Sequence, residues 1–264
     1  MKCKVVILNW NGREHLTKFL PSVVAATPES AGIVVVDNGS DDDSCPLIEN
    51  NFPSVELLRL DRNYGYAGGY NKAVLSQYFD DCDCLVLLNS DVETPAGWIE
   101  PLLDKMEREP GIAALAPKIL SYNNKTRFEH AGSAGGFIDA FGYPFCRGRI
   151  LSTIECDKGQ YDDARYVFWA SGACLVVRTD AFRELGGFDS DFFAHMEEID
   201  FCWRAQLAGW RIAIEPRSRV YHLGAGTLAA KTPRKIYLNF RNTLFTLYKN
   251  LSPRGRAITI FTRM

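Results

Sequence analysis

Short apolar runs alternate with longer segments of mixed polarity in the first half of the chain. Four of these runs predict buried strands, at residues 4–9, 32–37, 55–60 and 85–88. The segments between and after them predict helices at residues 13–26, 66–79 and 95–109, and Pro21 predicts a kink or break in the first. Strands that are apolar throughout and alternate with helices indicate a parallel sheet covered on both faces. We therefore expect residues 1–115 to form a doubly wound α/β unit of the nucleotide-binding type.

The pattern changes after this point. Residues 121–165 are rich in Gly, Asn, Tyr and charged residues without clear periodicity, which predicts loops and short strands. Two strands and two helices are predicted beyond them: a strand at 167–178 interrupted at Ser171-Gly172, helices at 180–185 and 197–208, and a strand at 210–214.

Polar residues follow three of the predicted strands. Asn9 ends the first, Asp37 and Asn38 follow the second, and Asn89-Ser90-Asp91 closes the fourth. The carboxyl ends of parallel strands lie on one edge of a sheet, where open α/β sheets bind ligands. A single Asp such as Asp37 can equally form a turn. Three polar strand ends on one edge favour a binding site, at which a carboxylate such as Asp91 can hold a metal ion.

The segment 63–71 combines glycines with amide and aromatic side chains. It contains Asn63, Gly65, Gly69 and Asn71 and opens the helix after the third strand. Glycines allow close approach of a ligand, and a helix N-terminus attracts anions. The alternative is a tight loop without a ligand. The segment does not match Gly-x-Gly-x-x-Gly, so dinucleotide binding is not supported.

Three acids begin the helix predicted at 197–208. Glu197, Glu198 and Asp200 lie among aromatic residues, which raise carboxyl pKa values and suit a general base. The alternative is that the helix dipole alone favours acids in the first turn. Glu197 and Asp200 share a helix face, whereas Glu198 points elsewhere. His222 is a candidate second metal ligand, although a lone His more often makes ordinary hydrogen bonds.

The composition is that of a globular protein, with 264 residues and 47% hydrophobic side chains. The eight cysteines include no Cys-x-x-Cys pair, which indicates reduced, buried thiols. No signal peptide precedes the first strand, so we expect a cytoplasmic protein. The whole chain has a formal net charge of −2, but residues 216–264 carry ten Lys or Arg and no Asp or Glu. This asymmetry predicts an anionic partner for the C-terminal part.

The C-terminal segment 231–264 has the pattern of a basic amphipathic helix. Its apolar stripe contains Ile236, Phe240, Leu244, Leu247 and Leu251, widened by Tyr237, Phe245 and Tyr248. Such a helix can lie on an anionic membrane. The alternative is that the stripe packs on the catalytic domain or on a second copy of the chain. The apolar run 258–261 at the end of the sequence suggests a natural protein that continues toward the membrane.

Eight motifs in this order resemble those of the family-2 glycosyltransferases with the GT-A fold, and among them the bacterial rhamnosyltransferase-like branch. They span the chain from Val5 to about Asn250: VVILNWNG, VVVDNGSDD, NYGYAGGYN, LLNSDVE, SGACLVVR, GGFDSDFFAHMEEIDFCWR, VYHLGAGT and NFRNTLFTLYKN. The resemblance implies a mostly parallel, Rossmann-like sheet flanked by helices, followed by an acceptor-side region and a terminal helix. It divides the chain into a nucleotide-sugar-binding half (1–115), an acceptor and catalytic-base half (116–230) and the basic helix (231–264).

The resemblance also assigns roles to individual residues. LLNSDVE matches the Asp-x-Asp-type metal motif, so Asp91 would bind Mg²⁺ or Mn²⁺ on the diphosphate of a nucleotide sugar, with His222 as a further ligand. Asn89 stands where the first acid often is. Glu197-Glu198-Ile199-Asp200 matches Glu-Asp-x-Asp, whose second position is the base, here Glu198. The predicted donor-binding residues are Asn9, Asp37, Asn38, Asn63, Gly65, Gly69, Asn71, Asn89 and Ser90.

The expected reaction is inverting transfer from a UDP- or dTDP-sugar to a hydroxyl of a lipid-linked saccharide in surface polysaccharide synthesis. The enzyme would act at the cytoplasmic face of an anionic plasma membrane, and nucleic acid is not an expected partner. Two alternatives remain open. A sugar-nucleotide pyrophosphorylase would need a Gly-rich basic loop after the first strand, where residues 9–13 offer one Gly and Arg13. A non-catalytic nucleotide-sugar-binding subunit is favoured by the departures at Asn89 and Glu198.

Overall fold

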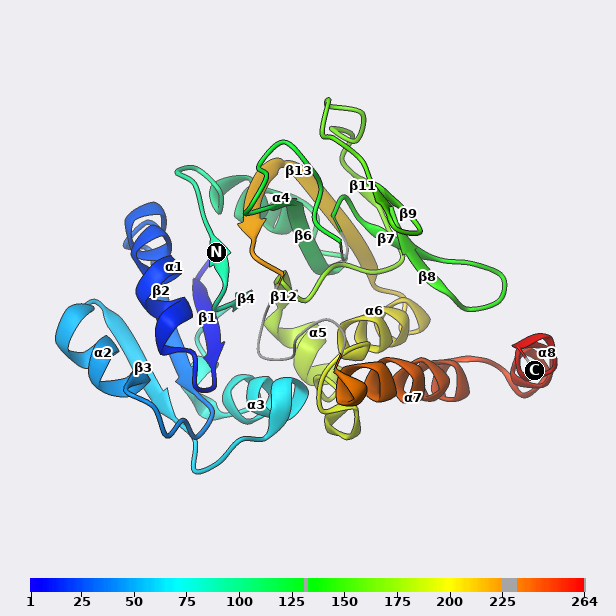
Figure 1. Ribbon diagram of the computed structural model, residues 1–264, viewed down its shortest axis with the longest axis horizontal. Helices are drawn as coiled ribbons and strands as arrows, with labels where there is room; N and C mark the ends of the chain where they lie inside the picture. Colours follow the sequence, from blue (N-terminus) through cyan, green and yellow to red (C-terminus); the bar gives the residue numbers. More distant parts are fainter. Residues whose placement is uncertain (131–132, 225–231, 264) are drawn as a thin grey trace.

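A computed structural model describes residues 1–130, 133–224 and 232–263 (Figure 1). One large mixed sheet runs through the described part of the chain, in the order β11-β13-β6-β12-β4-β1-β2-β3, with β5 paired to β13. Helices cover both faces of this sheet. The α/β architecture with helices flanking the sheet confirms the predicted fold class.

The first half of the sheet is parallel. Its strands are β1 (Cys3–Asn9), β2 (Ala31–Asp37), β3 (Val55–Arg59) and β4 (Cys84–Asn89). Successive side chains point to opposite faces, and both faces are covered: Val5 and Ile7 join one buried cluster, and Val6 joins the other. Burial on both faces explains why these strands are apolar throughout rather than alternating.

The helices of this half differ in detail from the predicted ones. They are α1 (Arg13–Ala26), α2 (Ser44–Asn51), α3 (Gly65–Val74), the 3₁₀ turn η1 (Gln77–Phe79) and α4 (Glu100–Arg108). α1 continues through Pro21, which lies on an exposed position of the helix. The helix expected at 95–109 begins only at Glu100, since Gly97 adopts a left-handed φ of 75° in the preceding turn. The two-turn helix α2 was not predicted, because eight residues are too few to establish a helical period.

The second half makes the sheet mixed. β12 (Cys174–Arg178) lies antiparallel between β4 and β6 (Ile112–Ser121), and β13 (Arg211–His222) runs parallel to β6. Two short strands pair with β13, namely β5 (Val92–Glu93) and β11 (Arg165–Tyr166). The strand expected at 167–178 with an interruption at Ser171-Gly172 is confirmed in its second part: the chain turns at 172–173 and Cys174–Arg178 pairs with β4. The first part of that prediction is wrong, because residues 167–170 form no strand. The strand expected at 210–214 extends to His222 because the register shift after Glu215 accommodates Pro216.

Two small antiparallel pairs occupy the segment predicted to be loops and short strands. They are β7 (Gly136–Ile138) with β8 (Pro144–Cys146), and β9 (Arg149–Ile150) with β10 (Thr153–Ile154). The remaining helices follow: α5 (Thr179–Glu184), the 3₁₀ turn η2 (Ser190–Phe192), α6 (Glu197–Leu207), α7 (Pro233–Asn250) and α8 (Pro253–Arg263). All eight cysteines are free thiols.

The C-terminal segment forms two helices, since Pro253 begins α8. α7 runs alongside α6, and α8 lies at the opposite end of the molecule from β3 (Figure 1). Some residues of the predicted apolar stripe are buried and others are exposed. Leu247 is buried together with Leu238, whereas Ile236, Phe240 and Tyr248 are 60%, 72% and 65% exposed. Within the described residues, no helix has the length and apolar character needed to span a membrane.

Candidate active site

The ends of β1, β2 and β4 meet at one edge of the sheet, as predicted. Asn9 is the register partner of Asp37, and Leu8 is the register partner of Asn89. Gly12, after β1, lies close to the end of β1 and to the turn after β4. A Cβ at this position would lie 2.3 Å from Oδ1 of Asn9 and 3.7 Å from Oγ of Ser90. Only glycine allows this contact, so the turn after β1 closes tightly on the edge of the sheet.

Asn9 and Asp37 form a buried polar pair. Nδ2 of Asn9 donates to Oδ1 of Asp37 (3.1 Å), and the backbone N–H of Ser40 donates to Oδ2 of Asp37 (3.0 Å). Asp37 therefore does form a turn, and it also orients Asn9. Oδ1 of Asn9 is buried and has no hydrogen-bond partner among the described residues. An unpaired buried acceptor carries a desolvation penalty, which a ligand N–H or O–H at this edge would relieve.

Asn38 and Asn63 hold the loop before α3. Nδ2 of Asn38 donates to Oδ1 of Asn63 and to the carbonyl of Gly65, and Oδ1 of Asn38 accepts from the backbone N–H of Tyr64. Gly65 has a φ of 74°, and a Cβ there would lie 2.6 Å from Phe193. At Gly69 a Cβ would lie 2.8 Å from the side chain of Leu8. Close packing of protein on protein thus accounts for both glycines.

Asn71 is engaged on the other side of α3. Its Nδ2 donates to the carbonyl of Phe188 (2.6 Å), and its Oδ1 accepts from the N–H of Phe188 (2.9 Å). Both ends of the amide are therefore used to attach α3 to the segment before α6. The structure does not bring Asn71 together with Asn9 and Asp37.

Asp91 and His222 are brought together by β5, which pairs with the end of β13. Nε2 of His222 lies 3.1 Å from Oδ1 of Asp91, and its Nδ1 lies 3.8 Å from Oε1 of Glu129. Burial opposes a charge on His222, but hydrogen bonds and charges of Asp91 and Glu129 raise its pKa to about 10. Burial likewise opposes ionisation of Asp91, yet His222 keeps the pKa of Asp91 below its usual value. Nδ2 of Asn89 lies 3.5 Å from the same imidazole nitrogen.

Glu197, which is buried, and Glu198, which is half-buried, begin α6. Burial is the main cause that raises the pKa of Glu198 to about 7. Burial and then the neighbouring Glu198 raise the pKa of Glu197 well above its usual value. Burial therefore disfavours the charged form of both carboxyls, and the pKa of Glu198 lies close to neutral pH. A carboxyl with a pKa near the working pH suits a general base.

The segment Ser171–Gly172–Ala173 connects this pair to the strand edge. The carbonyl of Ala173 accepts from the N–H of Asn89 (3.0 Å), and the carbonyl of Gly172 accepts from the hydroxyl of Tyr66 (2.7 Å). A Cβ at Gly172 would lie 3.7 Å from Cβ of Glu198. The end of β4 and the start of α6 therefore lie on either side of one short segment.

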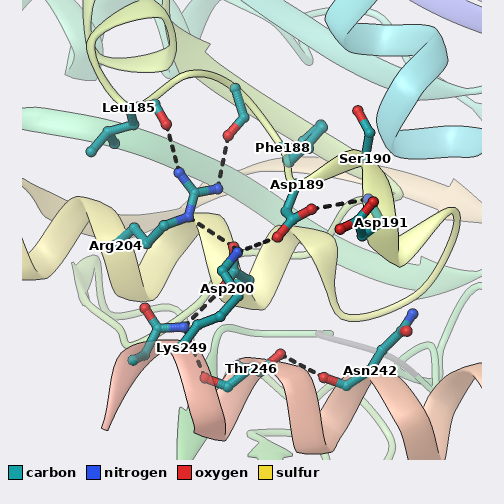
Figure 2. Close-up of polar contacts among 12 residues, drawn as sticks. Leu185, Phe188, Asp189, Ser190, Asp191, Asp200, Arg204, Asn242, Thr246 and Lys249 are labelled. Carbon is teal, nitrogen blue, oxygen red and sulfur yellow. Dashed lines mark hydrogen bonds and ion pairs between the residues drawn. The ribbon is translucent and has the colours of Figure 1, made fainter. Parts of the chain in front are cut away.

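Asp200 has a different environment from its neighbours (Figure 2). Its Oδ2 accepts from Nε of Arg204 (2.8 Å) and Nζ of Lys249 (3.0 Å), and its Oδ1 accepts from Nδ2 of Asn250 (2.8 Å). Arg204 also donates to the carbonyls of Leu185 and Gly187, both at 2.8 Å. The fully buried carboxylate thus joins α6 to α7 and to the turn after α5. Glu197 and Asp200 are both buried on α6, in agreement with the face they were expected to share, but the ion pairs with Arg204 and Lys249 belong to Asp200.

The turn before α6 has an unusual backbone. Phe193, His195 and Met196 have φ values of 63°, 72° and 72°. A non-glycine residue in this region costs about 1–3 kcal/mol, and such strain often occurs at functional sites. The carbonyls of this turn accept hydrogen bonds from α3 and from α7.

Sequence reasoning missed two groups of residues here. Glu129 lies in a segment without periodicity, and no local pattern brings it to His222. Arg204 could have been found, because the i,i+4 spacing from Asp200 predicts an ion pair on one helix. Lys249 and Asn250 reach Asp200 only through the packing of α7 on α6.

Comparison with known proteins decides the family. Residues 4–186 match the model of the glycosyl transferase family 2. N-acetylglucosaminyl-diphospho-decaprenol L-rhamnosyltransferase of Mycobacterium tuberculosis is 32% identical over 230 residues, 83% of this chain and 75% of the relative. The chain belongs to glycosyltransferase family 2.

Solved structures agree with this family-2 glycosyltransferase in fold. A crystal structure of GalNAc-T7 with UDP, GalNAc and Mn²⁺ superposes with a TM-score of 0.68 at 17% identity, over 94% of this chain and 48% of that chain. Mannosyltransferase PcManGT of Pyrobaculum calidifontis, with GDP-Man and Mn²⁺, gives a TM-score of 0.58 at 13% identity, over 99% and 79% of the two chains. The fold is the GT-A fold, and the protein is a glycosyltransferase.

The strand edge of this glycosyltransferase fits a divalent cation. Oδ2 of Asp91 is buried and has no hydrogen-bond partner among the described residues, and carboxylate oxygen is a ligand that Mg²⁺ and Mn²⁺ prefer. No cluster of three or more His, Cys, Asp or Glu side chains with metal-binding geometry occurs in the part of the chain that the structure describes. Sites with one or two protein ligands are typical where substrate phosphates complete the coordination.

Proposed function

We propose that the protein transfers a sugar, with inversion, from a dTDP- or UDP-sugar to a hydroxyl of a lipid-linked saccharide. The observation that carries this proposal is the unpaired, buried Oδ2 of Asp91 at the end of β4. It supports a binding site for a cation and the donor diphosphate, across a short segment from a carboxyl pair with raised pKa values.

The donor half, residues 1–115, binds the nucleotide sugar in this proposal. Asn9 and Asp37 contact the nucleoside, supported by the unpaired Oδ1 of Asn9. Asn89, Ser90 and Asp91 face the diphosphate. Asp91 and His222 hold the cation, which supplies neutralisation of the leaving diphosphate when bound. His222 must release its proton to act as a ligand.

Four other residues predicted to bind the donor receive indirect roles. Asn63 and Gly65 shape the loop beside Asn38. Gly69 lets α3 approach β1. Asn71 attaches α3 to Phe188 and so keeps the donor side in place relative to α6. We therefore expect substitutions at Asn71 to affect folding before they affect donor affinity.

The base half, residues 116–230, activates the acceptor. Glu198 accepts the proton of the acceptor hydroxyl, so that the hydroxyl oxygen can attack the anomeric carbon from the face opposite the leaving diphosphate. Burial raises the pKa of Glu197 and so disfavours a second negative charge beside the base. Asp200 holds α6 in place through Arg204, Lys249 and Asn250. A single displacement of this kind inverts the anomeric configuration.

The rhamnosyltransferase of Mycobacterium tuberculosis supports the substrate class. By its name it acts on N-acetylglucosaminyl-diphospho-decaprenol, a lipid-linked sugar, and transfers L-rhamnose. We extend both features to this chain: dTDP-rhamnose is the first donor to test, and a polyprenyl diphosphate saccharide is the first acceptor.

The third part, residues 231–264, places the enzyme on the cytoplasmic face of an anionic membrane. Ile236, Tyr237, Phe240 and Tyr248 are each 60% or more exposed on α7. Exposed aromatic and aliphatic side chains on one helix fit an interfacial helix. Lys249 contributes less than expected to the basic border, because it forms ion pairs with Asp189 and Asp200. Arg241 is directed toward the backbone carbonyl of Asp191. Lys231 lies outside the described residues.

The testing experiment measures donor-dependent release of nucleoside diphosphate. The purified chain is incubated with a panel of UDP-, dTDP- and GDP-sugars, with Mg²⁺ or Mn²⁺ and with a chelator, in the presence of a polyprenyl diphosphate N-acetylglucosamine. We expect release with one donor, dependent on metal and acceptor, and a product of inverted configuration. Release without metal, or retention of configuration, contradicts the proposed mechanism.

A further inference from the structure

The turn that leads into α6 has a backbone conformation that its own residues do not favour. Phe193, His195 and Met196 all adopt left-handed φ values, and none of them is glycine. Conformations of this kind persist only where surrounding structure determines them. The turn directly precedes Glu198, so whatever supports it also fixes where that carboxyl lies.

One support comes from the start of α3. The carbonyl of Phe193 accepts from the backbone N–H groups of Tyr66 (2.7 Å) and Ala67 (3.3 Å). A side chain at Gly65 would collide with Phe193, so this glycine permits the contact. These bonds fix one carbonyl of the turn and leave its other carbonyls to different partners.

The second support is a single amide group on α7. Asn242 is fully buried, and its Nδ2 lies 3.0 Å from the carbonyl oxygen of Phe192, 2.9 Å from that of Ala194 and 2.7 Å from that of His195. Its Oδ1 accepts from Nε of Arg241 (2.9 Å), which orients the amide so that its N–H groups face the turn. Figure 2 shows Asn242 on α7, opposite the segment that precedes α6.

Arg241 strengthens this attachment. Its Nη2 donates to the carbonyls of Asp191 (2.7 Å) and Phe192 (3.1 Å). Together Arg241 and Asn242 bind four backbone carbonyls at and just before the strained turn. These are the carbonyls of Asp191, Phe192, Ala194 and His195. Asn239, one helical turn earlier, provides a contrast: it is exposed and donates only to the carbonyl of Lys235 in its own helix.

We propose that Asn242 is a positioning residue for glycosyl transfer, which holds the turn at residues 192–196 so that Glu198 points at the acceptor hydroxyl. This inference rests on the proposed role of Glu198 as the base. Asn242 touches no substrate. It acts by presenting its N–H groups to the carbonyls of Ala194 and His195, and it adds to the donors that the carbonyl of Phe192 has in Ala194 and Arg241.

The chemistry of the position explains why an amide is needed. Aspartate has the same shape but would place acceptor oxygens against three carbonyl oxygens. Alanine removes this donor from the carbonyls of Ala194 and His195. Loss of the amide should therefore let the turn relax toward an ordinary conformation, with Glu198 displaced and the donor site, on the far side of the 171–173 segment, unchanged.

The test compares Asn242→Ala with Asn239→Ala, in the wild-type chain and in the Glu198→Gln chain. The assay is metal-dependent release of dTDP from dTDP-rhamnose with the polyprenyl diphosphate acceptor, or the active donor from the panel if it is another. A displacement of about 1 Å at a reacting group can cost roughly 100-fold. We expect Asn242→Ala to lower kcat on this scale with donor affinity unchanged, and Asn239→Ala to match the wild type.

The double variant separates the inference from the proposed function. If Glu198→Gln alone leaves turnover intact, the proposed base is wrong, whatever Asn242 does. If Glu198→Gln abolishes turnover but Asn242→Ala is as active as Asn239→Ala, only the positioning role is overturned. An equal loss from Asn242→Ala in both backgrounds also overturns it, because a residue that acts through Glu198 has little left to affect once the base is gone.

Asn242→Ala removes a buried side chain, so a milder variant is needed to test the positioning role if that protein does not fold. Arg241→Gln removes the orienting bond to Oδ1 from a side chain that is only partly buried. We expect it to give a smaller kcat loss in the same direction, together with faster hydrogen exchange in the peptide covering residues 190–198. Unchanged exchange and unchanged kcat in Arg241→Gln contradict the proposal even if Asn242→Ala is insoluble.

Discussion

Asp91 and His222 are far apart in the sequence, yet Nε2 of His222 lies 3.1 Å from Oδ1 of Asp91. β5 and the end of β13 create this contact by pairing just beyond the strand that ends in Asn89. The pair leaves Oδ2 of Asp91 unpaired and buried among the described residues. This is the arrangement expected of a cation ligand supported by a second group.

Asp91→Asn should remove metal-dependent transfer and leave the fold intact. The amide keeps the shape of the side chain but loses the charge that binds a cation, and changes around a metal site typically cost about 10–100-fold or more. Metal titration followed by nucleoside diphosphate release measures the effect, with Asp180→Asn as an exposed control. Turnover at the wild-type level in Asp91→Asn would exclude this residue as a ligand.

Glu198→Gln should stabilise the protein above neutral pH. Burial raises the pKa of Glu198 to about 7, so between the unfolded value near 4.5 and about 7 the folded state binds more protons than the unfolded state. Stability from this group is therefore present at low pH and declines as pH rises through that window. Removing the carboxyl should add about 3 kcal/mol at pH 8 and almost nothing at pH 4.5.

Chemical denaturation at several pH values checks this prediction. The difference in unfolding free energy between Glu198→Gln and the wild type should grow from pH 4.5 to pH 7.5 and then stay constant. A difference that is independent of pH would show that the carboxyl of Glu198 has an ordinary pKa, and that it lacks the property of a base at neutral pH.

Asp200→Asn should act on stability rather than on chemistry. Its carboxylate is fully buried and accepts from Arg204, Lys249 and Asn250, and breaking a buried ion pair costs about 3–5 kcal/mol. The midpoint of thermal unfolding should fall, while Asp191→Asn, at an exposed carboxylate, should leave it unchanged. A stable Asp200→Asn protein with abolished turnover would instead make Asp200 the base.

The sequence predicted the strand edge better than it predicted the helix contacts. Asn9, Asp37 and Asp91 end strands, and strand ends meet wherever parallel strands pair, so their proximity follows from a local pattern. The environment of Asp200 could not be predicted, because its partners Lys249 and Asn250 come from α7. That packing depends on which face of α7 is buried, and its apolar residues occupy more than one face.

The strand β6 was not predicted. β6 lies in the interval that followed the last predicted helix, where Pro117 and Lys118 interrupt an otherwise apolar run. Lys118 is nevertheless fully buried, paired with Asp157 and Asp162 from a distant loop. A charged residue inside a strand is intelligible only once its tertiary partners are known.

Point variants on the exposed face of α7 test membrane binding. Removing all residues after 230 would also remove the contacts that Asn242, Lys249 and Asn250 make with the base half. Truncation would therefore affect folding as well as membrane docking. We expect Tyr237→Ser with Phe240→Ser to lose sedimentation with anionic vesicles while keeping turnover on a soluble acceptor analogue. Asn239→Ala serves as the control on the same helix. Equal vesicle binding by the double variant and the control would contradict membrane docking and favour contact of the exposed face of α7 with a second copy of the chain.

The central claim, that Glu198 is the base of this glycosyltransferase, is tested most directly by Glu198→Gln in a single-turnover assay with donor affinity measured separately. The account predicts a loss of roughly 10²–10⁴-fold in the transfer rate, because a base acts in the transition state, with the donor dissociation constant unchanged. Glu197→Gln should lose less. A wild-type rate in Glu198→Gln, or a greater loss in Glu197→Gln, would contradict the claim.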